Sequence, residues 1–191
     1  MREMSLHILD IVENGINAGA DLIEISVAED VKVNQLRIAV RDNGGGIPAE
    51  LLGKVVDPFY TTRTTRRVGL GLSLFREASR RCEGEFSITS REGEGTEVRA
   101  SFRRDHLDLA PLGDMASSLV GLIAGNPGVD FVYTHEVNGK VFSLDTREVK
   151  RELNGVDISN PQVIKFVGDL VRESLEEMKQ GHGAEHTVQG S

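Results

Sequence analysis

Cysteine and tryptophan are nearly missing from this chain, which has one cysteine, Cys82, and no tryptophan. A single cysteine excludes an internal disulfide and a cysteine-rich metal site. No apolar run approaches the roughly twenty residues that a membrane-spanning helix needs, so we expect no membrane contact. No basic and then apolar leader precedes Met4, and these absences together lead us to expect a cytoplasmic protein.

Basic residues are also outnumbered, because 22 Lys and Arg stand against 30 Asp and Glu and give a net charge of -8. This balance argues against bulk attraction to nucleic acid or anionic lipid, so any anion must be held locally. A length of 191 residues predicts one domain and a smaller appendage.

Helix-like and strand-like patterns alternate over residues 1–105 and predict an α/β (α+β) domain. The expected elements are a helix at 5–18, strands at 22–27 and 35–40, a short helical piece at 49–55, a loop at 57–67, a helix from 69 to about 82, and strands at 85–90 and 96–102.

Residues 106–180 predict a separate small α-β-β-α-α unit, to which the sequence assigns no role. Its two strands flank Asn138-Gly139, a strong hairpin signal. The tail at 181–191 is expected to be disordered. The expected elements of the unit are helices at 112–124, 146–153 and 161–179 and strands at 130–137 and 140–144.

A glycine turn follows the second expected strand, in the sequence Asp42-Asn43-Gly44-Gly45-Gly46-Ile47. Glycines let the backbone approach a ligand closely, and a buried carboxylate such as Asp42 can accept a hydrogen bond from the exocyclic amine of an adenine. Taken alone, the stretch is also typical of an ordinary turn.

Two further features suit a phosphate and its cation. Gly69 and Gly71 precede an expected helix, where unobstructed backbone N–H groups can bind phosphate, although a flexible helix start has the same composition. Asp10 and Asn14 lie one turn apart on the first helix and point the same way. An Asn oxygen suits Mg²⁺, and the alternative is a solvated polar stripe.

In this order and spacing, the features resemble the ATPase domain of the GHKL superfamily, which comprises gyrase, heat-shock proteins, histidine kinases and MutL. The resemblance covers about Ser5 to Phe102 and is closest to the histidine-kinase-like branch. The matching motifs are Glu13-Asn14-x-x-Asn17-Ala18 (N box), Asp42-x-Gly44-x-Gly46 (G1 box), Asp57-Pro58-Phe59-Tyr60-Thr61-Thr62 (F box), Gly69-Leu70-Gly71-Leu72 (G2 box) and Gly95-Thr96.

The resemblance implies a two-layer α/β sandwich of the Bergerat type, with a mixed sheet, helices on one face, and ATP and Mg²⁺ bound between them. It implies that Asp42 binds the adenine amine, Asn14 coordinates Mg²⁺, and Phe59 anchors the lid. The nucleotide-site residues that it implies are Asn14, Asn17, Ala18, Asp42, Gly44, Gly46, Ile47, Phe59, Thr61, Thr62, Arg63, Arg66, Arg67, Gly69, Leu70, Gly71, Leu72 and Thr96.

The lid that this resemblance implies is short and runs from Tyr60 to Val68. Its Arg63, Arg66 and Arg67 are the local cations for a triphosphate, since guanidinium groups match phosphate geometry. The alternative interpretation is a solubilising loop.

Two acidic residues of the first expected helix are candidates for the general base. MutL-like and anti-sigma relatives have a glutamate one turn before the N-box Asn, and Asp10 occupies that place here. Glu13 is the alternative, but adjacent helical residues diverge by about a third of a turn.

The N-box helix begins almost at Met1, without the helical hairpin that carries the phosphoacceptor histidine, so we do not expect a complete histidine kinase. The five histidines show no metal spacing and are predicted to be ordinary surface residues: His7, His106, His135, His182 and His186.

Three functions remain open. The first is an ATP-binding regulator that hydrolyses ATP slowly or phosphorylates a partner protein, as an anti-sigma-like serine kinase would. The second is a non-catalytic module whose partner affinity depends on ATP. The third is a MutL-like ATP-gated dimer clamp, which would make the protein a homodimer.

Overall fold

The computed structural model describes residues 3–57 and 70–180, so the predicted tail at 181–191 lies outside the described residues. In chain order the elements are α1 (Met4–Asn17), β1 (Leu22–Asp30), β2 (Gln35–Asp42), α2 (Ala49–Leu52), α3 (Leu70–Arg81), β3 (Phe86–Arg91), β4 (Gly95–Arg103), α4 (Met115–Gly125), β5 (Asp130–Val137), β6 (Lys140–Asp145), α5 (Thr146–Glu152) and α6 (Pro161–Gln180).

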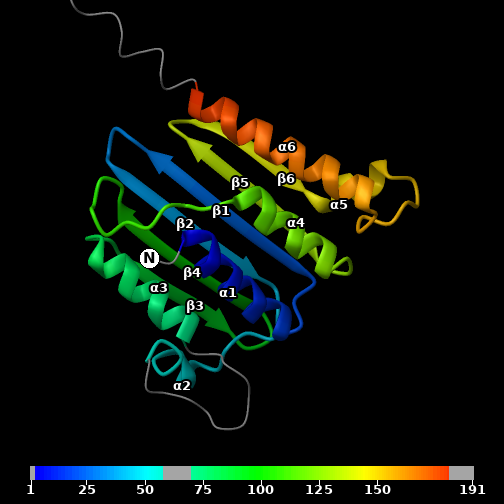
Figure 1. Ribbon diagram of the computed structural model, residues 1–191. Helices are drawn as coiled ribbons and strands as arrows, with labels where there is room; N and C mark the ends of the chain where they lie inside the picture. The colour runs from blue at the N-terminus through cyan, green and yellow to red at the C-terminus, as the bar shows by residue number, and fades with distance from the viewer. Residues whose placement is uncertain (1–2, 58–69, 181–191) are drawn as a thin grey trace, which may run out of the picture.

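All the strands join one mixed six-stranded sheet in the order β3-β4-β2-β1-β5-β6. Neighbouring strands are antiparallel, except that β1 and β5 run parallel. Figure 1 shows α1, α3 and α4 side by side across one face of the sheet. The expected two-layer α/β sandwich with a mixed sheet is therefore confirmed.

The layers follow from the side-chain periods of helix and strand. Strands β1 and β2 alternate buried and exposed residues, so one face of the sheet is apolar. Helix α1 covers that face with its buried residues, among them Ile8, Ile11 and Val12. The same core continues under α3, α4 and α6 through Phe75, Leu119 and others.

The C-terminal strands, which the sequence assigns to a separate small unit, lie in the same sheet as the N-terminal strands. Strand β5 pairs along β1, with Ile23 opposite Phe131 and Val27 opposite His135, and β6 extends the same sheet. Without β5, the β1 edge would expose a row of unpaired backbone groups. The boundary expected at residue 105 falls in the connection between β4 and α4, and independent folding of either part remains a prediction.

The predicted hairpin signal holds at the turn between β5 and β6. Asn138 and Gly139 both have positive φ, at 48° and 86°, as the expected Asn-Gly hairpin requires. Within the described residues, no helix has the length and apolar character needed to cross a bilayer.

Candidate functional site

Asp42 ends β2 at the edge of the helix layer and is only 9% exposed. Its Oδ1 accepts a hydrogen bond from the Gly44 N–H at 2.9 Å, and the carboxylate also accepts from the backbone N–H of Thr96 on β4. Among the described residues it forms no ion pair, and burial raises the pKa of this carboxyl despite those two bonds. A desolvated acceptor of this kind suits a ligand N–H group.

The space beside this carboxylate depends on two glycines. A Cβ on Gly15 of α1 would lie 2.9 Å from the Cβ of Asp42 and 3.2 Å from its Oδ2. A Cβ on Gly44 would lie 3.0 Å from both Asp42 Oδ1 and the Cβ of Ala18. Sequence reasoning missed Gly15, although an isolated glycine inside a regular helix costs stability and so signals a packing reason.

The glycine turn after β2 is fixed against the β3–β4 hairpin. The Ile47 N–H donates to the Ser90 hydroxyl at 2.8 Å, and that hydroxyl lies 2.9 Å from the hydroxyl of Thr96. Gly46 has a φ of 69°, and a Cβ there would overlap the carbonyl oxygen of Arg91. Gly45 donates its N–H to the carbonyl of Ala18 at 2.8 Å, which ties the turn to the end of α1.

Asp10 faces the start of α3 rather than open solvent. A Cβ on Gly71 would lie 2.9 Å from the Cβ of Asp10 and 3.4 Å from its Oδ2. Asn14 follows one turn later on the same flank, half-buried, and lies between Asp10 and Ala18 along the helix. The G1-box and G2-box segments therefore both lie against α1, the helix that carries the N box.

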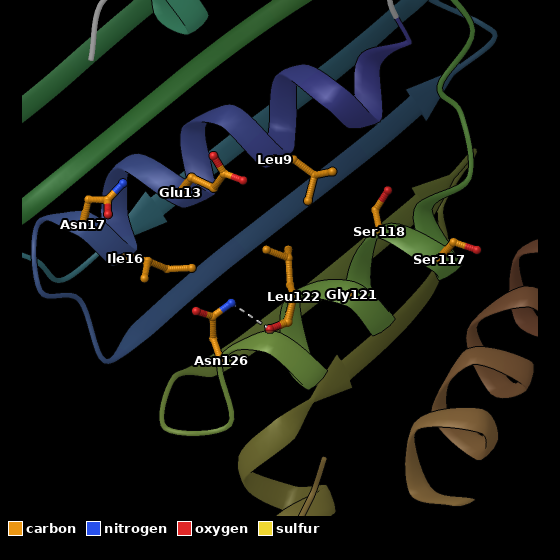
Figure 2. A pocket seen from close by; sticks show the side chains of 9 residues that line it. All are labelled: Leu9, Glu13, Ile16, Asn17, Ser117, Ser118, Gly121, Leu122 and Asn126. Carbon is orange, nitrogen blue, oxygen red and sulfur yellow. Dashed lines mark hydrogen bonds between the residues drawn. The ribbon is translucent and has the colours of Figure 1, made fainter. Parts of the chain in front are cut away.

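Glu13 and Asn17 border a different region. Both line a groove of about 490 Å³ between α1 and α4, on the other flank of α1 from α3 (Figure 2). A carboxylate in this place is less suited than Asp10 to act on a ligand held between α1 and α3.

Two further residues of the predicted nucleotide site differ in exposure. Leu70 is 57% exposed, whereas Leu72 is 4% exposed in the hydrophobic core, so any ligand contact of Leu72 must come from its backbone. The lid predictions lie outside the described residues, as does one glycine of the G2 box: Phe59, Thr61, Thr62, Arg63, Arg66, Arg67 and Gly69.

The surface prediction is wrong for two of the histidines. His7 is 5% exposed and packs against Phe75, with ring centroids 5.6 Å apart. His135 is 1% exposed, because β5 is an inner strand and the position faces the helices. It bonds Tyr133 Oη at 2.7 Å and Glu29 Oε1 at 3.2 Å. His182 and His186 lie outside the described residues.

Solved structures support the architecture. The chain superimposes on the crystal structure of an N-terminal domain of a DNA repair protein with a TM-score of 0.53 and 18% identity. The alignment covers 76% of this chain and 53% of the other. At that identity, the likeness shows a shared fold.

Two sequence relatives are described as sensor histidine kinases. The chain is 31% identical over 109 residues to a putative sensor histidine kinase NtrY-like of Rickettsia conorii, covering 57% of this chain and 18% of the relative. It is 35% identical over 99 residues to the sensor histidine kinase YxdK of Bacillus subtilis, covering 48% of this chain and 30% of the relative. The chain thus spans less than a third of the length of these relatives.

The family itself is shown by the N-terminal part of the chain. Residues 3–106 match the family model described as histidine kinase-, DNA gyrase B-, and HSP90-like ATPase. This range contains every predicted nucleotide-site residue and each of the glycine turns described above. The chain belongs to the family of histidine kinase-, DNA gyrase B- and HSP90-like ATPases.

Proposed function

We propose that this protein is a regulator that binds Mg-ATP and either hydrolyses it slowly or transfers its phosphate to a partner protein. The observation that carries the proposal is the Asp42 carboxylate, which is desolvated, lacks an ion pair among the described residues, and is held by two backbone N–H groups. Such a group is costly to keep without a ligand and is suited to an adenine amine.

The other parts of the nucleotide would lie along the same flank of α1. The start of α3 provides backbone N–H groups for phosphates, next to Gly71. Asn14 would supply one hard oxygen to Mg²⁺, with phosphate oxygens and water as the further ligands. The bound cation would neutralise phosphate charge, and we assign the lid arginines Arg63, Arg66 and Arg67 to the same task.

For the reaction we assign Asp10 as the general base. Asp10 lies against Gly71, which supports a position on the phosphate side of α1, whereas Glu13 lines the groove toward α4. Asp10 would accept a hydrogen bond from the attacking water or partner hydroxyl and then take its proton.

A nucleotide-sensing module without catalysis is the second candidate. One observation favours it, namely that the C-terminal strands share the sheet that carries Asp42, through the pairing of β1 with β5. A change of partner affinity on ATP binding would need no chemistry.

Titration with a fluorescent ATP analogue, with and without Mg²⁺, tests the pocket. We expect saturable binding by the wild type and about ten- to hundredfold weaker binding by Asp42→Asn, whose amide N–H would meet the adenine N–H. Glu97→Gln is the matched control, because Glu97 lies next to Thr96 on β4 but pairs with Arg99 on the open face. Equal affinity of Asp42→Asn and wild type would refute the assignment.

Phosphate release separates the two candidates. Slow release that is lost in Asp10→Asn and kept in Glu13→Gln supports catalysis with Asp10 as base. Binding without any release, in the same preparations, supports the sensing module. Equal release by Asp10→Asn and wild type would remove Asp10 from the mechanism.

A further inference from the structure

A groove runs between α1 and α4, apart from the proposed nucleotide flank. Figure 2 shows Leu9 and Ile16 of α1 pointing toward Leu122 of α4, which gives the groove an apolar floor. Its volume is about 490 Å³, and it extends along α1 from Leu9 to Asn17. At about 1.5 Å per residue, this corresponds to about 12 Å of helix.

The polar side chains around this floor include several acceptor oxygens. Ser117 Oγ donates to Asp114 Oδ2 at 2.6 Å, and Ser118 Oγ donates to the Asp114 carbonyl at 2.8 Å. Asn126 Nδ2 donates to the Leu122 carbonyl at 3.0 Å. These bonds use both hydroxyl hydrogens and one of the two amide hydrogens of Asn126, and they leave the hydroxyl and amide oxygens free to accept.

Glu13 adds the only formal charge of this groove. None of the nine lining residues is Lys, Arg or His. Within the described part of the chain, the Glu13 carboxylate has neither a hydrogen bond nor an ion pair. An apolar floor with acceptors and one carboxylate at its rim complements an aliphatic stem that ends in a cationic donor.

We propose that the α1–α4 groove docks a partner protein through a Lys or Arg side chain, with the aliphatic stem on the apolar floor and the cation at Glu13. A free amine is the weaker fit, because a single exposed ion pair in an open groove contributes little net binding, and a free amine lacks the further contacts that a partner protein makes around its side chain. A second copy of this chain is also disfavoured, since each copy has a net charge of -8.

The test uses NMR spectroscopy of the full-length, nucleotide-free protein in about 0.15 M salt, which screens diffuse attraction. The probes are Nα-acetyl-lysine amide, its uncharged counterpart Nα-acetyl-norleucine amide, and spermidine. We expect the lysine probe to shift the amide signals of Leu9, Glu13, Gly121 and Asn126 with millimolar affinity, and the norleucine probe to bind at least about threefold more weakly.

Two variants make the result specific to the groove. Glu13→Gln is expected to reduce the lysine probe to the affinity of the norleucine probe. Gly121→Leu fills the groove, because a Cβ at Gly121 has no atom within 4 Å, and is expected to abolish both shifts.

Each contrary result overturns the proposal. These are the absence of localised shifts, equal shifts from the two amino acid probes, or an unchanged affinity in Glu13→Gln. Spermidine that binds at the same signals at least about tenfold more tightly than the lysine probe would indicate a site for a free polyamine instead. Because no nucleotide is present, failure of the ATP proposal would not affect this outcome.

Discussion

Gly15→Ala is the substitution that tests most directly how α1 shapes the site. In the interior of a helix, alanine is ordinarily more favourable than glycine by about 0.8–1 kcal/mol. At Gly15, however, the new Cβ would lie 2.9 Å from the Cβ of Asp42 and 3.1 Å from its Cγ. Optimal carbon contacts are about 3.5–4.0 Å, so Asp42 must move by about 0.6 Å or more.

Helix propensity and overpacking against Asp42 together decide the stability of the Gly15→Ala variant. Overpacking of this size costs about 1–3 kcal/mol, which offsets the gain in helix propensity and leaves a net loss of about 0–2 kcal/mol. The same shift would stretch the 2.9 Å bond from Gly44 to Asp42 beyond good geometry. We therefore expect Gly15→Ala to fold and to bind ATP about ten- to hundredfold more weakly, since a hydrogen bond to a charged group contributes about 1.5–3 kcal/mol.

Urea denaturation and titration with a fluorescent ATP analogue measure the two effects separately. Gly121→Ala is the matched control, because this glycine also lies inside a helix but a Cβ there has no atom within 4 Å. It should stabilise the protein by up to about 1 kcal/mol and leave ATP binding unchanged. Wild-type affinity together with increased stability in Gly15→Ala would refute the steric argument.

Three further predictions concern stability. Gly46→Ala should lower the free energy of unfolding by more than about 2 kcal/mol in urea denaturation, because φ is 69° and the Cβ would overlap the Arg91 carbonyl; a smaller loss would show that the turn can relax. Because burial raises the pKa of Asp42, its stabilising contribution is complete below its ordinary value of 3.8 and is lost as pH rises through the folded-state value. Nucleotide-free Asp42→Asn should therefore have a higher melting temperature than wild type at about pH 7 and little advantage near about pH 3; an equal difference at both would contradict this assignment. The hydrogen bond with His135 lowers the pKa of Glu29, so its contribution is complete above 4.5 and is lost as pH falls through the folded-state value. Glu29→Gln should flatten the acid side of the melting-temperature profile, and an unchanged acid slope would count against it.

Local patterns were sufficient to predict the elements. The strand expected at 130–137 has those bounds in β5, and the helix expected at 161–179 is α6, which ends at Gln180. Both depend on near neighbours in sequence, namely alternation, a proline at the first helical position, and turn residues at the ends. Such signals persist in the folded chain because no distant contact overrides them here.

The arrangement of those elements was less accessible. The parallel pairing of β1 with β5 joins residues that are more than a hundred positions apart, and alternation in each strand is the same whichever strand is its neighbour. For the same reason, His135 was predicted on the surface although it is 1% exposed. A polar residue in an alternating strand can face either side, and here His135 faces the helices, where Tyr133 and Glu29 bond its ring nitrogens.

The candidate site shows the same contrast between local sequence signals and contacts of distant residues. Motif order predicts Asp42, Asn14 and Gly71 as site residues, whereas no spacing in the sequence encodes the close approach of Gly15 to Asp42. The groove beside Glu13 was also inaccessible, since four of its nine lining residues come from α4 and a fifth, Asn126, directly follows that helix.

Helix α1 is the element that the two proposed sites share. It contacts α3 on one flank and α4 on the other, and Ile8, Ile11 and Val12 hold it to the sheet between them. A shift of α1 on nucleotide binding would therefore change the floor of the α1–α4 groove, which Leu9 and Ile16 provide. Thermodynamic linkage makes such an effect reciprocal: the factor by which ATP changes partner affinity equals the factor by which the partner changes ATP affinity.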